Sequence, residues 1–419
     1  MKKKVIIGII SVLVVISGCL FVMFNSSNKS YYVITNNNEE KVMNTNALTM
    51  MYETEAGSGE YQVTSDTTWP QEGYVFNKQL SACENGSELT WDDENKRVIM
   101  EANTSDKCYV YFDVYVPPKI TDICISGANL ASCIKEFNSI AGDSAEGLYY
   151  HDGVGTYGTL EAGDNSYRFA GANPNNYVCF GSDEATCPAD NLYRIIGVFD
   201  EQVKLIKYDY AGEITLGTAP ASDGTPDASY YKGSLSSIPF YYWSGSSSNR
   251  SNTWSSSTLN TDILNGTYLN TLGSEWTSKI ATTSWKVGGM SSSSTNTAKQ
   301  YYTTELGSSS SSTTYSAKIG LMYVSEYGYA ASPENWNTAL RYYNNDTNRN
   351  NNWMFMGGTE WTISRDSDRT NYAFFVSYAG VVLSNYVYRS YGVRPSFSLE
   401  SDVVLSGGSG SSADPYRLV

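Results

Sequence analysis

Residues 5–24 form a run of apolar and small side chains directly after Lys2, Lys3 and Lys4, and no comparable run recurs in the chain. At about 1.5 Å per residue, a helix of this length would reach roughly 30 Å, the thickness of a bilayer core. The lysines are expected to stay on the cytoplasmic side. The sequence therefore predicts a signal anchor, a transmembrane helix over residues 1–24, in a single-pass protein of the cell membrane whose C-terminal region is extracellular.

A lipid on Cys19 is the alternative anchor. Residues 16–19 read Ile-Ser-Gly-Cys, which fits the cleavage box of a bacterial lipoprotein. The apolar run, however, continues to residue 24, whereas a lipoprotein signal turns polar after its cysteine. The apolar core of a signal peptide is also shorter, about 7–15 residues. We therefore favour the uncleaved anchor, and lipidation of Cys19 remains the second possibility.

Length and charge restrict the function classes. A chain of 419 residues with an anchor and a spacer is expected to hold roughly two domains. A net charge of −15 argues against nucleic acid as a partner and against docking on anionic lipid, because both need clustered Lys and Arg. The 35 tyrosines, with many Ser and Asn, are typical either of adaptable recognition surfaces or of a β-rich fold.

Six further cysteines all lie in the first half of the exported region, and in an oxidising compartment they are expected to form disulfides. Pairing sequence neighbours gives the simplest set: Cys83 with Cys108, Cys124 with Cys133, and Cys179 with Cys187. On one unbroken helix residues 124 and 133 would lie about 13 Å apart, too far to bond. The second pair therefore requires Gly127 to break the segment. No zinc-ligand spacing is present, and the single histidine, His151, is expected in an exposed loop.

The polar and apolar patterns divide the rest of the chain. Residues 25–47 are predicted to be a spacer, and residues 48–116 a small β domain of sandwich type. Its clearest strand is 108–116, in which apolar and polar side chains alternate. Residues 117–163 are expected to connect it to a C-terminal domain over 164–419.

The C-terminal domain is predicted to combine strands and helices. The apolar runs 192–199 and 203–210 read as a hairpin. Residues 257–272 read as an amphipathic helix, and 318–324 as a strand. The last hundred residues alternate short apolar runs with polar turns, as in an antiparallel or mixed sheet. We therefore expect a β-rich α+β fold class.

The order of these segments resembles a bacterial domain of unknown function, number 6273. The resemblance covers about residues 165–419. It rests on the following motifs: Tyr-Arg-Ile-Ile-Gly-Val at 193–198, Trp-Ser-Ser-Ser-Thr-Leu-Asn at 254–260, Met-Tyr-Val-Ser-Glu at 322–326, Trp-Thr-Ile-Ser-Arg at 361–365, and Gly-Val-Arg-Pro at 392–395. That domain is more distantly similar to the C-type-lectin-like fold of formylglycine-generating enzymes, which implies a twisted sheet that displays long loops.

Two departures argue against transferring chemistry from the lectin-like fold. Formylglycine generation needs a pair of late redox cysteines, and this chain has none after Cys187. Calcium lectins use Glu-Pro-Asn followed by Trp-Asn-Asp, whereas residues 333–337 read Pro-Glu-Asn-Trp-Asn. We therefore predict no metal and no cofactor.

Two Tyr- and Asn-rich segments, 342–353 and 372–391, are the candidate recognition loops, because tyrosine and asparagine can bond sugar hydroxyls and tryptophan can stack on a sugar face. The candidate ligand-binding residues are Tyr342, Tyr343, Asn345, Asn348, Trp353, Tyr372, Tyr386 and Tyr388. Trp361, Arg365 and Arg394 are expected to be structural.

No catalytic motif supports an enzyme: the chain has no Gly-x-Ser-x-Gly, no His-Glu-x-x-His and no phosphate loop. The sequence predicts a membrane-anchored bacterial cell-surface protein that is not an enzyme and that binds a glycan or a protein through its C-terminal loops. The alternatives are a structural subunit of a surface appendage or layer and, less favoured, a carboxylate-based glycosidase.

Overall fold

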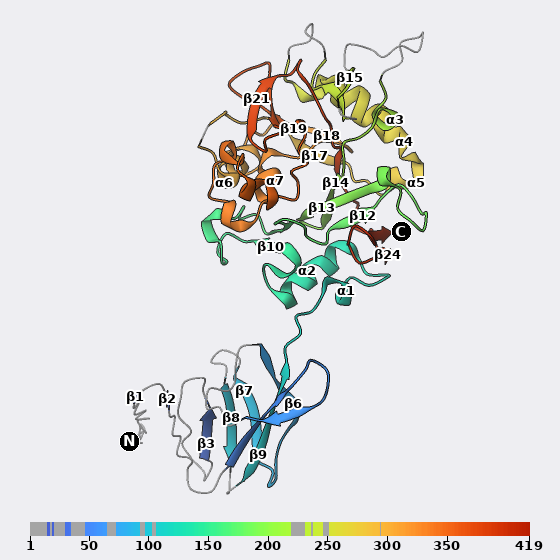
Figure 1. Cartoon of the computed structure of the whole chain (residues 1–419). Helices are drawn as coiled ribbons and strands as arrows, with labels where there is room; N and C mark the ends of the chain where they lie inside the picture. The colour runs from blue at the N-terminus through green and yellow to red at the C-terminus, as the bar shows by residue number, and fades with distance from the viewer. Residues whose placement is uncertain are drawn as a thin grey trace, which may run out of the picture. The chain divides into compact units, whose positions relative to one another are not determined.

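The computed structural model describes residues 47–64, 73–92, 97–102, 106–218, 231–235, 238–245, 251–293 and 295–419, together with the backbone pairing of three short strands before residue 35. The chain forms two compact units (Figure 1), unit 1 at Met1–Pro117 and unit 2 at Pro118–Val419.

Unit 1 is built from strands alone in its described part. They are β1 (Val15–Ile16), β2 (Cys19–Leu20), β3 (Ser30–Ile34), β4 (Ala47–Glu53), β5 (Tyr61–Val63), β6 (Tyr74–Cys83), β7 (Glu88–Asp92), β8 (Arg97–Ala102) and β9 (Lys107–Val114). One sheet has the order β5-β4-β9-β6 and another the order β3-β8-β7. The range 25–47, which the sequence predicts to be a spacer, thus contains a strand that pairs with β8.

Alternation along β9 explains the core of unit 1. Cys108, Val110 and Phe112 are fully buried, whereas Tyr109 and Tyr111 between them are half-exposed. Successive side chains of a strand point to opposite faces, so one face of β9 packs inward against β7 and β8. This is the pattern that the sequence predicts for residues 108–116.

Unit 2 contains sixteen strands in its described part, several of them very short. They are β10 (Leu148–His151), β11 (Ser166–Phe169), β12 (Tyr177–Cys179), β13 (Leu192–Phe199), β14 (Gln202–Lys207), β15 (Tyr231–Leu235), β16 (Ile238–Tyr242), β17 (Thr283–Lys286), β18 (Thr314–Ala317), β19 (Glu360–Arg365), β20 (Tyr372–Val376), β21 (Val382–Tyr386), β22 (Ser390–Tyr391), β23 (Ser396–Ser398), β24 (Leu405–Gly407) and β25 (Tyr416–Leu418).

The main sheet of unit 2 joins segments that lie far apart in the sequence. Its order is β10-β11-β13-β12-β25-β24, and β14 pairs with both β13 and β23. The predicted hairpin at 192–199 and 203–210 is confirmed as β13 and β14. Residues 117–163, which we expect to be a connector, supply β10 to this sheet and also form two helices, α1 (Ile120–Ile123) and α2 (Leu130–Ala141).

The helices are short. The α-helices are α1 (Ile120–Ile123), α2 (Leu130–Ala141), α3 (Glu213–Leu216), α4 (Leu269–Thr271), α5 (Gly273–Ser278), α6 (Ala298–Glu305), α7 (Val324–Tyr329) and α8 (Asp346–Asn350). A ten-residue π-helix, η5 (Leu259–Tyr268), and six short 3₁₀ helices complete the described set: η1 (Ala145–Gly147), η2 (Gly158–Leu160), η3 (Ala189–Asn191), η4 (Trp254–Ser256), η6 (Pro333–Asn335) and η7 (Leu340–Tyr342). The helix predicted at 257–272 corresponds to η5 and α4. The strand predicted at 318–324 is wrong, because α7 begins at Val324 and the nearest strand, β18, ends at Ala317.

The expected α+β class is wrong: the chain is mostly β-strand with few helices. The longest α-helix, α2, has 12 residues, and α6 has only 8. The buried hydrophobic residues of unit 2 come from its strands, its short helices and its connecting segments alike.

The predicted membrane anchor is also wrong. No helix of the described residues has the length and the apolar composition needed to cross a bilayer. Within the apolar run, β1 and β2 pair as antiparallel strands, and paired strands cannot belong to one continuous helix, since their hydrogen bonds join two segments. The rest of residues 5–24 lies outside the described residues. A single-pass location in the cell membrane, with membrane contact through 5–24, is therefore not supported.

All three predicted disulfides are confirmed, which is typical of an oxidising compartment. Between Cys124 and Cys133 the helix is broken as required, because α1 ends at Ile123 and Gly127 takes a left-handed φ of +88°. This turn brings the two Cα atoms within 5.1 Å of each other. Lipidation of Cys19 stays a prediction, since the structure describes only the backbone of that residue.

Candidate functional site

The β20–β21 hairpin of unit 2 is held between two hydrophobic cores. It continues an antiparallel sheet that begins with β19. Ala373 and Phe375 of β20 pack into one core, and Phe374 and Val376 pack into the other. The alternation of a strand thus buries both faces of the hairpin, which makes it a rigid support for the side chains at its two ends.

Three tyrosines and one arginine stack at the open end of this hairpin. Tyr372 lies opposite Tyr386 across the two strands, with 4.4 Å between ring centroids. The ring of Tyr388 lies 4.8 Å from that of Tyr386, and the guanidinium carbon of Arg369 lies 4.1 Å from the centroid of Tyr372. All four residues are half-exposed. We call these four residues the tyrosine stack; its spacings are those of favourable aromatic and cation–π contacts.

A buried carboxylate fixes the arginine of the stack. Asp366 is fully buried and accepts hydrogen bonds from Nε and Nη2 of Arg369, at 2.9 and 2.5 Å. Nη2 also donates to the Ser384 hydroxyl at 2.7 Å. Below them, the Asn252 amide donates to the backbone carbonyls of residues 366, 369 and 372. The guanidinium plane is therefore oriented before any ligand arrives.

The Tyr372 hydroxyl remains protonated at neutral pH. Its hydrogen bond with the Tyr386 side chain, followed by partial burial, raises the pKa of Tyr372 above its usual value. A neutral phenol both donates and accepts hydrogen bonds. This residue is thus suited to pairing with ligand hydroxyls.

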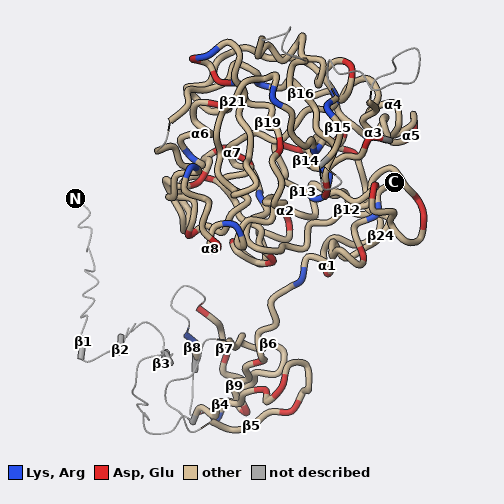
Figure 2. Tube along the Cα trace, turned by 45° about the horizontal axis from the view of Figure 1, so that its top comes forward, with Lys and Arg blue, Asp and Glu red and all other residues tan. Residues whose placement is uncertain are grey.

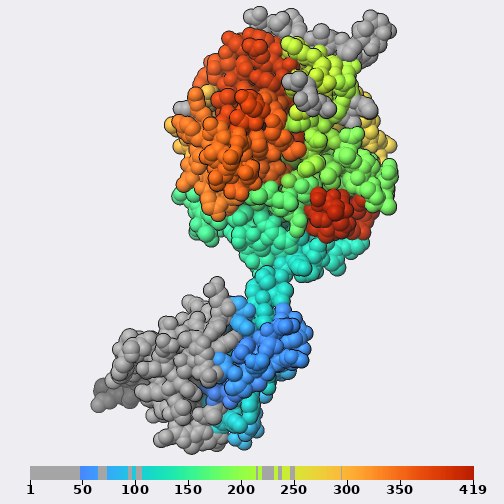
Figure 3. Space-filling model, viewed as in Figure 1, coloured from blue at the N-terminus to red at the C-terminus, as the bar shows by residue number. Residues whose placement is uncertain are grey.

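The closed end of the hairpin carries two exposed tyrosines, Tyr378 in the turn and Tyr342 in η7, which we call the tip patch. Their exposed fractions are 74% and 56%. The turn packs closely on the neighbouring segment: Gly380 has a φ of +85°, and a Cβ there would lie 2.8 Å from the Tyr343 carbonyl oxygen and 2.9 Å from Cγ of Arg349. In Figure 3 the orange and red segments of unit 2 adjoin on the surface shown.

The predicted ligand-binding residues therefore form two groups, not one site. Tyr372, Tyr386 and Tyr388 lie at the open end of the hairpin, and the segment 342–353 lies at its closed end. The five residues of β21 between them span about 13 Å, at about 3.3 Å per residue.

Most of the segment 342–353 is structural. Tyr343 is fully buried, and its hydroxyl donates to the Asn335 carbonyl. Asn345 caps α8 by accepting from the Asn348 backbone N–H at 2.8 Å, and the buried Asn348 side chain donates to the Tyr342 carbonyl. An asparagine-rich loop thus uses its amides to hold its own backbone, as asparagines at helix starts do.

Trp353 also belongs to the interior. Its Nε1 donates to the Phe169 carbonyl at 2.7 Å, and the guanidinium of Arg194 lies over its ring at 4.6 Å. Of the residues predicted in this segment, only Tyr342 and Asn345 are exposed.

Several charged side chains in the interior of unit 2 are neutralised by ion pairs or by backbone hydrogen bonds. Arg394 binds both carboxylate oxygens of Glu360, at 2.7 and 2.9 Å. Lys204 pairs with Glu326 at 2.6 Å. Glu305 accepts from the backbone N–H groups at the start of α7. These pairings account for the buried charges structurally, and they confirm the bracing role predicted for Arg394.

The structural roles predicted for Trp361 and Arg365 are also confirmed. Trp361 is buried and donates to the Tyr241 carbonyl at 2.8 Å. Arg365 bonds the Val287 carbonyl and the Asn252 side chain.

His151 is buried in β10, so the predicted exposed position is wrong. Its Nδ1 accepts the Ala162 backbone N–H at 3.1 Å, and its ring lies 4.8 Å from those of Tyr329 and Trp336. Burial, and next the charge of Arg168, hold the pKa of His151 well below its usual range. A Gly- and Asp-rich neighbourhood suggested a loop, but Tyr149 and Tyr150 before it already carry the strand pattern.

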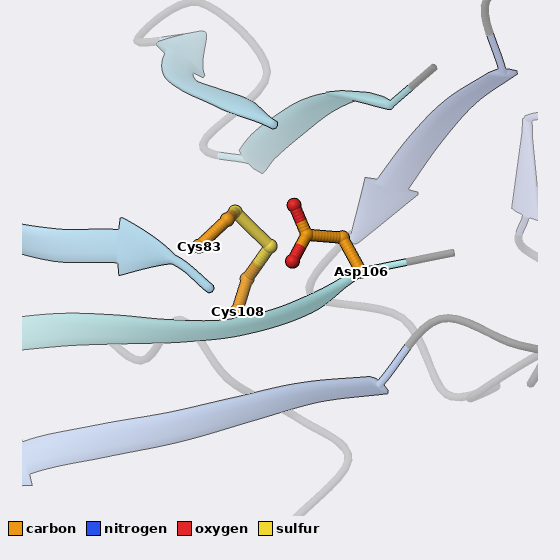
Figure 4. Close-up of side chains that lie close together, drawn as sticks. All are labelled: Cys83, Asp106 and Cys108. Atoms are coloured by element: carbon orange, nitrogen blue, oxygen red, sulfur yellow. A yellow bond between two sulfur atoms is a disulfide. The ribbon is translucent and has the colours of Figure 1, made fainter. Parts of the chain in front are cut away.

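One group of metal-type ligands occurs among the described residues: Cys83, Asp106 and Cys108, whose ligand atoms lie within 4.8 Å of one another (Figure 4). The two sulfurs are bonded to each other and so offer no thiolate. The Asp106 carboxylate accepts the backbone N–H groups of residues 85, 87 and 107. The group is therefore a disulfide-linked turn and not a metal site.

Sequence reasoning did not single out Arg369 as a site residue, whereas Tyr378 belongs to the predicted recognition segment 372–391. Arg369 follows the turn Asp-Ser-Asp, three residues before Tyr372. The sequence signal for the stack was the three-residue spacing from Arg369 to Tyr372, together with the two tyrosines at 386 and 388.

Comparisons with known proteins support the resemblance. The family model of the domain of unknown function DUF6273 matches residues 235–401, a shorter range than the 165–419 expected. No curated protein and no solved structure matches the chain. Unit 2 thus carries a DUF6273 domain, which includes the tyrosine stack and the tip patch.

Proposed function

We propose that unit 2 is a non-catalytic recognition domain that binds carbohydrate at the two ends of the β20–β21 hairpin. The observation that carries this proposal is the tip patch: two large aromatic rings are mostly exposed while the backbone beneath them is closely packed. Rigid tyrosines lose little conformational entropy on binding, and their rings and hydroxyls suit the mixed polar and apolar faces of a sugar.

The charge distribution argues against nucleic acid as the ligand. In Figure 2, the Lys and Arg positions are scattered along the trace of unit 2 among acidic and other residues. The whole chain carries a net charge of −15. Binding of nucleic acid depends on many phosphate contacts made together.

The ion pairs in the interior of unit 2 argue for ligand binding rather than catalysis by a pair of carboxylates. A carboxylate glycosidase needs two acidic groups that flank a cleft, one with a raised pKa. Glu360 and Glu326 are instead paired with buried cations. A recognition role needs no such groups, because it relies on surface complementarity alone.

A glycan array with the full chain is the first test, and titration with the best ligand is the second. The double variant Tyr342→Ala/Tyr378→Ala is expected to weaken binding by about tenfold, or about 1.4 kcal/mol. Tyr115→Ala is the matched control, since Tyr115 is 43% exposed but belongs to unit 1. The proposal fails if no glycan binds or if both variants bind as tightly as the parent chain. Self-association seen by light scattering would instead favour a structural subunit.

A further inference from the structure

The segment 152–164 is attached to the rest of unit 2 by a hydrogen bond to the buried ring of His151. Nδ1 of this ring accepts the backbone N–H of Ala162 at 3.1 Å. A ring nitrogen that accepts a hydrogen bond carries no proton, so the proton of the neutral ring is on Nε2. Nε2 itself has no hydrogen-bond partner among the described residues. We call the bond from Ala162 to His151 the histidine latch.

The histidine latch requires a neutral ring. A proton added to Nδ1 would place a donor against the N–H of Ala162, which is also a donor, and the bond would be lost. The N–H of Nε2 would at the same time stay in the interior without an acceptor. A buried charge without hydrogen-bond partners is strongly unfavourable. The closed arrangement of the segment therefore excludes the charged form of His151.

The groups that face His151 also oppose a positive charge on it. Burial contributes most to lowering the pKa of His151, followed by the charge of Arg168 in β11. Lys299 of α6 lowers this pKa as well, whereas the Asp164 carboxylate raises it. That carboxylate is already paired with Arg168, at 2.6 Å. An acid that neutralises another cation compensates an imidazolium poorly.

Uncharged rings cover the histidine latch, and the segment contributes to this cover. The rings of Tyr329 and Trp336 each lie 4.8 Å from the ring of His151. Tyr157, within the segment, packs against Trp336 with 5.3 Å between ring centroids. The His151 ring is fully buried in this arrangement, so it reaches solvent only when its cover moves.

Two further hydrogen bonds attach the segment to the helices beside it. Nζ of Lys299 donates to the Ala162 carbonyl at 2.8 Å, and the Tyr329 hydroxyl donates to the Leu160 carbonyl at 3.1 Å. Neither bond involves a histidine. Acidification below neutral pH therefore acts on this attachment through the histidine latch.

We propose that the histidine latch is acid-sensitive: protonation of His151 releases the segment 152–164 while the sheets of unit 2 stay folded. The open form exposes the ring to solvent, where it takes up a proton near pH 6.5. Because only the open form binds this proton, its population rises about tenfold for each pH unit below 6.5. Opening also uncovers Trp336, which is fully buried in the closed form. This device is independent of the proposed carbohydrate binding.

Hydrogen exchange of the full chain, followed by mass spectrometry of its peptides, tests the latch. After correction for intrinsic exchange rates, the peptide that covers 152–164 is expected to be less protected than the peptide that covers β13 and β14. Its protection factor should fall about tenfold between pH 7.5 and 5.5. His151→Gln should remove this fall. Lys299→Gln is the matched control, because it deletes another bond to Ala162 but keeps the histidine; it should lower protection at both pH values and retain the tenfold fall.

Two acids of the segment titrate as well, but they are common to all three proteins. Burial raises the pKa of Glu161, and backbone hydrogen bonds lower the pKa of Asp152. The difference between the parent chain and His151→Gln therefore isolates the histidine.

Equal protection of the two peptides would overturn the proposal, because the segment would then open only when unit 2 unfolds as a whole. The same fall in the parent chain and in His151→Gln would overturn it too, since another group would then sense the pH. If His151→Gln does not fold, the pH curve of the parent chain decides. A one-proton dependence that begins near pH 6.5 supports the latch, and any other dependence refutes it.

Discussion

Acidification from pH 7.5 to 5.5 should destabilise this protein through His151, its only histidine. The folded pKa of His151 is held well below 6.5 by burial. The unfolded chain takes up a proton as the pH falls through about 6.5, and the folded chain does not. The contribution of His151 is therefore fully present above pH 6.5 and is lost as the pH falls toward the folded pKa. At pH 5.5 the loss amounts to about 1.4 kcal/mol in the free energy of unfolding.

Urea unfolding followed by tryptophan fluorescence at pH 7.5 and 5.5 measures this loss. His151→Gln is the control, since a glutamine oxygen can still accept the Ala162 N–H but does not titrate. Buried carboxyls with raised pKa values, such as Glu305, act in the opposite direction, since their contribution is lost as the pH rises. They are common to both proteins, so the difference between parent and variant isolates the histidine. Identical pH dependences for the two proteins would refute the reasoning.

Three further predictions concern stability and the hairpin. Arg394→Met should cost about 3–5 kcal/mol in urea unfolding, because it leaves Glu360 buried and unpaired, and adding Glu360→Gln should recover part of the loss; an additive double variant would contradict this coupling. The double variant Cys83→Ser/Cys108→Ser removes a disulfide that joins residues 25 positions apart in sequence. It should lower the free energy of unfolding of unit 1 by about 3 kcal/mol, measured with urea, while the unfolding of unit 2 stays unchanged. Gly380→Ala should weaken glycan binding in the titration, because its Cβ would lie 2.8 Å from a carbonyl oxygen, whereas Gly357→Ala has a similar φ of +79° with nothing within 4 Å and should bind normally.

Local patterns predicted the parts of the fold that depend on neighbours in sequence. The strand at β9 follows from two-residue alternation, and the β13–β14 hairpin from two apolar runs with a short turn. The three disulfides follow because each pair closes a short loop. Gly127 had to break the helix for the second bond to form, and its left-handed φ does so.

Burial of polar residues was not predictable in the same way. Composition made 342–353 look like an exposed recognition loop, but the Asn348 amide donates to the Tyr342 carbonyl within the segment, and the Trp353 indole donates to the Phe169 carbonyl of β11. His151 was misplaced for the same reason, since the rings that bury it come from residues near 330. Apolar composition alone also misled at residues 5–24, where it does not distinguish a spanning helix from paired strands.

The topology of the main sheet has a practical consequence for anyone who isolates the DUF6273 region. Its strands come from both sides of the matched range: β10 to β14 precede residue 235, and β24 and β25 follow residue 401. A fragment trimmed to 235–401 would keep β23 but lose β14, against which it pairs, and would leave the apolar underside of the domain open to water. Expression should therefore begin near Pro118 and run to Val419, since the limits of sequence similarity cut through a single cooperative fold.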